Sequence, residues 1–180
     1  MKRFAVLTAV SLFLAVAFPL TAQAQMESES GFKIGPRATV ALGDISDFGG
    51  DFAIGGDVRY DLSANVDAPI QLSGAFDFYF VDDQPAVTGQ SGEADASAYT
   101  IDLNGLYSFP TEGTISPYAG GGLGIVGTSV GDFSDTDVGL NLTGGAEFEA
   151  GSLRPFAQAQ VSFGGDFTRF GITGGVLFAL

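Results

Sequence analysis

The chain has 180 residues, with 21 acidic residues against seven basic ones and a formal net charge of −14. A chain this acidic cannot bind nucleic acid by neutralising phosphates, so we expect no nucleic-acid partner. Cysteine and histidine are both absent. Without cysteine there is no disulfide framework, and the fold alone must hold an exported form together.

The first 24 residues have the pattern of a secretory signal peptide. Two basic residues precede an apolar run over Phe4–Leu20, and Ala22-Gln23-Ala24 is a small-x-small cleavage site. An uncleaved membrane anchor is the alternative, but the run is short for a span and Pro19 interrupts it. We therefore predict a signal peptide over 1–24 and a short lead over 25–31. Cleavage would leave five basic residues against 21 acidic ones, a net charge near −16 and enough chain for one domain.

From Phe32 onward, apolar residues occupy every second position in eight successive stretches. In the first, Phe32 and Ile34 alternate with Lys33 and Gly35. A period of two predicts a strand rather than a helix. The predicted strands cover residues 32–43, 52–62, 70–80, 99–109, 117–125, 138–148, 155–163 and 170–180.

The connections complete the fold prediction. We expect connecting loops at Asp44–Asp51, Asp82–Ser97 and Gly127–Thr136, alternating with shorter turns. An even number of strands joined in this way is what a single-chain bacterial barrel requires. Strands of about ten residues, at ~3.3 Å rise and ~40° tilt, span roughly 25 Å, the height of a membrane barrel's apolar band. The sequence thus predicts an all-β, eight-stranded, antiparallel, up-and-down transmembrane β-barrel over residues 32–180.

Charge indicates which face points inward. The five basic residues beyond the predicted leader all fall in the polar phase of the strands. A soluble barrel would instead present a dense Lys/Glu surface to water, and an Arg facing lipid at mid-bilayer costs ~2–4 kcal/mol. We therefore expect a polar lumen with a charge network formed by Arg37, Asp57, Arg59, Asp77, Asp102, Glu147 and Arg169.

Two roles for this network remain open: pairing of buried charges, and lining of a narrow conduction path. An eight-stranded barrel is just wide enough for side chains to fill, which favours a plugged lumen.

Aromatic residues predict two girdles, one at each membrane interface. One end is expected to gather Phe32, Tyr60, Tyr107, Phe109, Phe148 and Phe178. The other is expected to gather Phe52, Phe78, Phe80, Tyr99, Phe163 and Phe170.

Acidic residues cluster in the predicted loops. Asp132, Asp135 and Asp137 are weak candidates for a metal site, because they do not match the EF-hand pattern and a solvated acidic loop is the commoner case. Beside anionic lipopolysaccharide such loops would repel unless salt screens them or divalent cations bridge them. Divalent cations are thus candidate partners.

No cofactor and no catalytic residue are expected. Gly122-x-Gly124-x-x-Gly127 matches a dinucleotide-binding string, but no helix follows it to bind a phosphate. We expect these glycines to allow close packing in the interior beside Tyr118 and the Arg side chains instead. Serine or aspartate without a histidine or cysteine partner is a poor nucleophile, so we predict that the chain is not an enzyme.

Two segments resemble a known family. Pro117-Tyr118-Ala119-Gly120-Gly121-Gly122-Leu123-Gly124 and Gly139-Leu140-Asn141-Leu142-Thr143-Gly144-Gly145-Ala146-Glu147-Phe148 are similar to the fifth and sixth strands of small outer-membrane β-barrel, or porin family, proteins of the opacity and outer-membrane protein X type. The resemblance covers essentially all of 32–180. It implies the outer membrane of a Gram-negative-type bacterium, with lipid and lipopolysaccharide as partners.

The last strand resembles the signal that the barrel-assembly machinery reads. Thr173-x-Gly175-x-x-Phe178-x-Leu180 has the polar residue, the glycine and the spaced hydrophobic residues, although Leu180 replaces the usual terminal Phe. Enzymatic barrels of this size, the lipid A palmitoyltransferase and deacylase types, use a histidine that this chain lacks. The sequence therefore predicts a non-enzymatic outer-membrane barrel with an envelope-structural or surface-interaction role through acidic extracellular loops. The alternative is a narrow porin-like channel for ions or small solutes.

Overall fold

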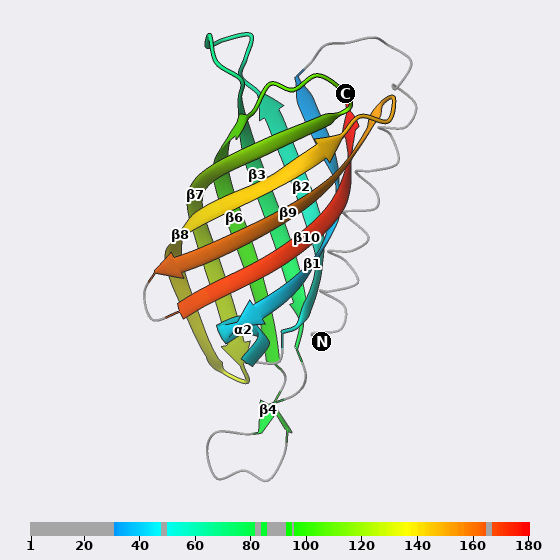
Figure 1. Cartoon of the computed structure of the whole chain (residues 1–180). Helices are drawn as coiled ribbons and strands as arrows, with labels where there is room; N and C mark the ends of the chain where they lie inside the picture. Colours follow the sequence, from blue (N-terminus) through cyan, green and yellow to red (C-terminus); the bar gives the residue numbers. More distant parts are fainter. Residues whose placement is uncertain (1–30, 48–49, 82–83, 86–92, 95, 165–166) are drawn as a thin grey trace. The chain divides into compact units, whose positions relative to one another are not determined.

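A computed structural model describes residues 31–180, except for 48–49, 82–83, 86–92, 95 and 165–166. The predicted signal peptide and most of the lead lie outside the described residues. Eight strands form a closed barrel in the order β1-β10-β9-β8-β7-β6-β3-β2 (Figure 1). Their bounds are β1 (Phe32–Gly43), β2 (Phe52–Asp61), β3 (Ile70–Phe80), β6 (Ala96–Ser108), β7 (Ile115–Val130), β8 (Phe133–Phe148), β9 (Leu153–Gly164) and β10 (Phe167–Ala179).

All neighbouring strands are antiparallel, and the first strand closes the barrel by pairing with the last, from Lys33 opposite Ala179 to Gly43 opposite Arg169. The strands alternate in direction, so two ends can be defined. The α2 end carries the short helix α2 (Asp44–Asp47) and the turn between β7 and β8. The Phe32 end carries the start of β1 and the turns after β2, β6 and β8.

Two predicted loops contain regular structure. Asp44–Asp51 includes α2, and Asp82–Ser97 includes β4 (Gln84–Pro85), β5 (Glu93–Ala94) and the first residues of β6. The strands β4 and β5 pair with each other in a separate two-stranded sheet. None of the helices among the described residues is long and apolar enough to cross a membrane.

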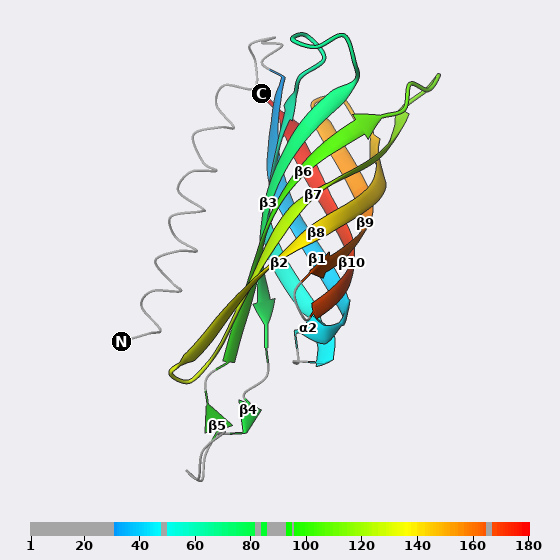
Figure 2. The same ribbon diagram turned by 90° about the vertical axis from the view of Figure 1, so that its left-hand side faces the viewer.

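The predicted loop Gly127–Thr136 is wrong. The strands β7 and β8 stay paired up to Val130 opposite Phe133, and a two-residue turn joins them (Figure 2). Gly131 has a φ of 59°, as the first position of a type II′ hairpin turn requires. The β-branched and aromatic residues that flank the turn favour a strand. The strand preference of these flanking residues is stronger than the loop preference of the glycine, serine and aspartate residues in the same segment.

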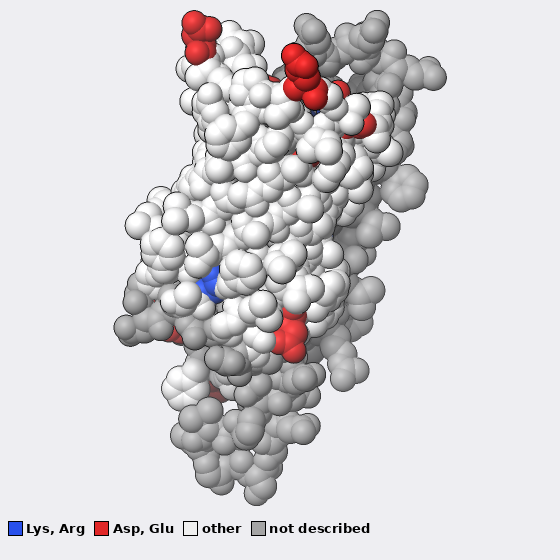
Figure 3. Space-filling model, viewed as in Figure 1, with Lys and Arg blue, Asp and Glu red and all other residues white. Residues whose placement is uncertain are grey.

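The predicted alternation of faces holds along the barrel. On β6, Leu103 on the outer face is 61% exposed, whereas its neighbours Asp102 and Asn104 are 1% and 6% exposed. The middle of the barrel wall is largely uncharged on the face that Figure 3 shows. Aromatic rings lie together on the outside at both ends: Phe32 with Tyr60 at the Phe32 end, and Phe52 with Phe80 at the α2 end. The barrel therefore has an apolar outer face and a polar interior.

Candidate functional site

The lumen contains a balanced set of buried charges. Because inward positions recur every second residue, each of the seven residues predicted for the network lies in the interior and is buried. Lys33 joins them at the Phe32 end, and its place in the polar phase of β1 could have identified it. The four basic residues Lys33, Arg37, Arg59 and Arg169 match four acidic ones, Asp57, Asp77, Asp102 and Glu147.

Arg59 lies at the centre of the largest group of contacts and is 0% exposed. Its Nη1 donates to Glu147 Oε1 at 2.8 Å, and its Nε and Nη2 donate to the two carboxylate oxygens of Asp57, both at 3.2 Å. The guanidinium carbon lies 4.9 Å from the ring centroid of Tyr118 and 4.4 Å from that of Phe156. Charge pairing and ring packing together fill the lumen at this level.

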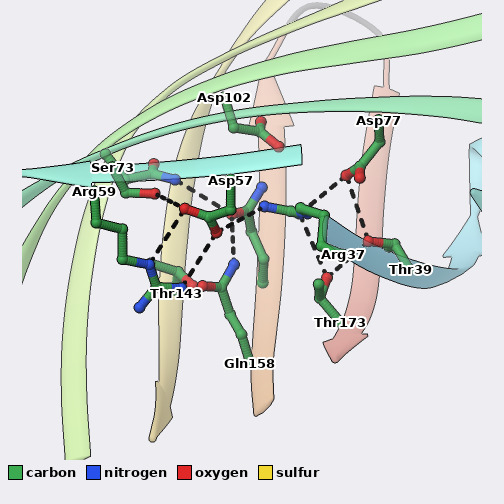
Figure 4. Close-up of polar contacts among 12 residues, drawn as sticks. Arg37, Thr39, Asp57, Arg59, Ser73, Asp77, Asp102, Thr143, Gln158 and Thr173 are labelled. Carbon is green, nitrogen blue, oxygen red and sulfur yellow. Dashed lines mark hydrogen bonds and ion pairs between the residues drawn. The ribbon is translucent and has the colours of Figure 1, made fainter. Parts of the chain in front are cut away.

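Asp57 links Arg59 to Arg37, as Figure 4 shows. Arg37 Nη1 lies 3.5 Å from Asp57 Oδ2, and its Nη2 donates to Asp77 Oδ2 at 2.9 Å. The hydroxyls of Thr39 and Thr173 lie 2.8 Å apart next to this pair. At the other side of Arg59, Glu147 also accepts from Lys33 Nζ at 2.6 Å. A chain of ion pairs thus runs from Lys33 to Asp77.

A second cluster lies nearer the α2 end. Arg169 Nη2 donates to both carboxylate oxygens of Asp102, at 2.9 and 3.0 Å, and to Ser162 Oγ at 3.0 Å. Its Nη1 donates to Tyr79 Oη at 3.4 Å. Asn141 Nδ2 donates to Asp102 Oδ1 at 2.9 Å. Thus the cation and its anion are both hydrogen-bonded on several sides, which buried charges require.

Four buried polar atoms have no hydrogen-bond partner within the described part of the chain: Arg37 Nε, Asp77 Oδ1, Thr100 Oγ1 and Asn141 Oδ1. Two of them are close neighbours, because Asp77 on β3 lies opposite Thr100 on β6. Buried polar groups normally have a partner, and where the protein offers none this is usually water. These atoms indicate where internal water would bind.

The glycine string lies within β7, with different neighbours from those expected. A Cβ on Gly124 would meet Asn141 Oδ1 at 2.7 Å and Asp102 Oδ1 at 2.8 Å. It is Gly145, on β8, that lies against Tyr118, where a Cβ would meet the Tyr118 hydroxyl at 2.8 Å. Gly124 therefore leaves space for the second charge cluster, in which Arg169 binds Asp102. The predicted packing of this glycine beside Tyr118 is wrong.

The weak metal candidates lie on the β7–β8 hairpin rather than in a loop. Asp132 is in the turn, while Asp135 and Asp137 are on β8. Throughout the described residues, no group of three or more acidic side chains is arranged to hold a metal ion. The prediction of an acidic loop is therefore wrong: Asp135 and Asp137 lie on a strand. Their carboxylates and that of Asp132 do not surround a common metal position.

A family model described as the outer membrane protein β-barrel domain matches residues 10–177. The chain belongs to this family. It is an outer-membrane β-barrel, and the predicted fold class and resemblance to small barrels of this kind are confirmed. No curated protein matches the chain in sequence.

Solved outer-membrane barrels share the fold. Neisserial surface protein A (NspA) is 19% identical with a TM-score of 0.58, over 86% of this chain and 100% of that one. The N-terminal β-barrel domain of Pseudomonas aeruginosa OprF is 18% identical with a TM-score of 0.56, over 81% and 96%. Ail, the attachment invasion locus protein of Yersinia pestis, is 18% identical with a TM-score of 0.53, over 85% and 99%. At these identities the likeness shows the fold alone.

Proposed function

We propose that this outer-membrane β-barrel is a closed, non-enzymatic anchor in a Gram-negative-type envelope, and that it presents an interaction surface outside the cell. The observation that carries the proposal is the filled lumen around Arg59. Its guanidinium is fully buried between two aromatic rings and two carboxylates. The four cations and four anions of the lumen are paired with each other, so they offer no unpaired charge to a permeating ion.

The surface that the barrel would present lies at the α2 end. The pairing of β8 with β9 begins at Leu140, so the segment from Phe133 to Val138 pairs only with β7 among the described residues. Phe133, next to the hairpin turn, is 69% exposed. We assign this end to the cell exterior, because the longer connections of membrane barrels are extracellular. An exposed aromatic residue and free backbone edge groups are typical features of binding surfaces.

The chemistry of this end favours cationic partners. Beyond the predicted leader, basic residues occur only in the lumen and, as Arg154, at the Phe32 end. One structure of Ail contains the heparin analogue sucrose octasulfate. In this chain the connections at the α2 end carry carboxylates and no basic residue, so we expect no such polyanion to bind there. Lipopolysaccharide would contact this end through bridging cations or in screening salt.

Thermal melts in NaCl and MgCl₂ at matched ionic strength test the role of cations. Because no described carboxylate group converges on a metal position, we expect both salts to raise the melting temperature along one common curve, through screening. A larger gain in MgCl₂ would show specific bridging instead. A melting temperature that neither salt changes would contradict both roles and leave the carboxylates merely solvated.

Planar-bilayer recording tests the closed barrel. We expect purified protein to give no reproducible single-channel steps, because side chains occupy the lumen. Conductance steps that Arg59→Gln or Asp77→Asn abolishes or rescales would establish the alternative, a narrow channel for ions or small solutes. Steps that neither substitution affects would point to a contaminant, which a mock preparation from cells without the protein identifies.

A further inference from the structure

An apolar layer interrupts the polar lumen at the α2 end. Deeper in the lumen, many inward-facing residues are charged or carry a hydroxyl. Near the α2 end, the inward-facing residues of five strands are small, aliphatic or aromatic instead. These are Ala41 on β1, Ala53 on β2, Tyr79 on β3, Ala98 on β6 and Val126 on β7, all buried in one hydrophobic cluster. Three of the five are alanines, so the strands leave space between them. We call these five residues the alanine socket.

Ile45 of α2 fills the socket and is 3% exposed. The chain reaches this position through Gly43, whose φ of 91° turns it inward from the end of β1. Two backbone hydrogen bonds secure the segment: Gly50 N–H donates to Ile45 C=O at 2.8 Å, and Ala41 N–H donates to Asp51 C=O at 2.9 Å. Ile45, from a connecting segment, is thus the sixth buried member of the hydrophobic cluster, and Val81, just after β3, packs against that cluster.

Polar groups begin directly beneath the socket. Tyr79, a wall of the socket, accepts a hydrogen bond from Arg169 through its hydroxyl. Thr100 is the next inward residue after Ala98 on β6 and is 0% exposed. Its hydroxyl and the neighbouring Asp77 Oδ1 are two of the buried atoms without a partner in the described chain. Asp77 Oδ1 can only accept a hydrogen bond, whereas the Thr100 hydroxyl can donate or accept one, so a water molecule can satisfy both groups.

We propose that Ile45 is a stopper whose seating in the alanine socket seals hydrated polar groups around Thr100 and Asp77 from the α2 side. Water and small solutes reach these groups from that side only when Ile45 leaves the socket. The inference rests on the proposed closed barrel and adds a second seal to it. Arg59 closes the lumen towards the Phe32 end, and the stopper closes it towards the α2 end.

The absence of cysteine makes the chain suitable for a labelling test. Thr100→Cys places a thiol beneath the stopper at a residue whose hydroxyl has no partner to lose within the described chain. Ser134→Cys, at an exposed position on β8, is the accessible reference. The probe is methanethiosulfonate ethylammonium, a small cation, applied to folded protein in micelles and followed by mass.

With Ile45 present, we expect the thiol at position 100 to react at least about tenfold more slowly than the thiol at 134, because reaction requires local opening. Ile45→Ala should raise the rate at 100 by about tenfold and leave the rate at 134 unchanged. Ile45→Val should give an intermediate rate. Adding Ala98→Leu to Ile45→Ala returns the lost volume to the socket and should restore protection.

Two results would overturn the stopper. One is rapid labelling of position 100 while Ile45 is present. The other is unchanged protection in Ile45→Ala and Ile45→Val, with folding verified by the mobility of unboiled samples on a detergent gel. Rapid labelling without bilayer conductance would refute the stopper and leave the closed barrel standing. Conductance with position 100 still protected would refute the closed barrel instead.

Discussion

Replacing Arg59 by methionine is expected to lower the free energy of unfolding by about 3–5 kcal/mol, the cost of leaving buried charge uncompensated. Arg59 is fully buried and contacts both Asp57 and Glu147. Without it, the lumen holds four acidic residues and three basic ones. Methionine keeps much of the side-chain length between the two rings, so the loss reports on charge more than on packing. Urea unfolding in lipid vesicles, followed by circular dichroism, measures the change.

A second substitution separates charge balance from packing. Arg59→Met combined with Asp57→Asn returns the lumen to three basic and three acidic residues, and each of these keeps an ion-pair partner. We expect the double variant to be more stable than Arg59→Met alone, because residues that share an ion pair have strongly non-additive effects. Destabilisation equal to the sum of the two single effects would contradict a role for charge balance.

The membership of this network follows from sequence, but its pairing does not. A strand period of two is enough to assign Asp57 and Arg59 to the lumen. Which residues then touch depends on how far neighbouring strands are staggered around the closed barrel. Arg59 and Glu147 are 88 positions apart and meet across the lumen. No local pattern encodes that contact, and it emerges only when all the strands are placed.

The stopper escapes prediction from sequence for a different reason. Ile45 and Phe48 are the two large apolar residues in a segment otherwise rich in aspartate and glycine, which is the composition of a solvated loop. The burial of Ile45 depends on the alanine socket. In the sequence, the socket residues Ala41, Ala53 and Ala98 look like ordinary small residues of a barrel interior. A weak signal is nonetheless present, since charged residues in the inward phase give way to alanine and valine near the α2 end of several strands.

The outer face of β6 provides the sharpest test of the membrane orientation. Leu103 is exposed and lies midway between Tyr99 and Tyr107, residues of the two predicted girdles on the same face of the strand. Leu103→Arg should therefore place a cation in hydrocarbon and cost ~2–4 kcal/mol, whereas Tyr107→Arg, near an interface, should cost ~0–1 kcal/mol. Urea titrations in vesicles measure both, and unboiled gels report the folded fraction. Equal tolerance of the two substitutions would mean that this face does not lie in lipid, because in water neither arginine would be desolvated.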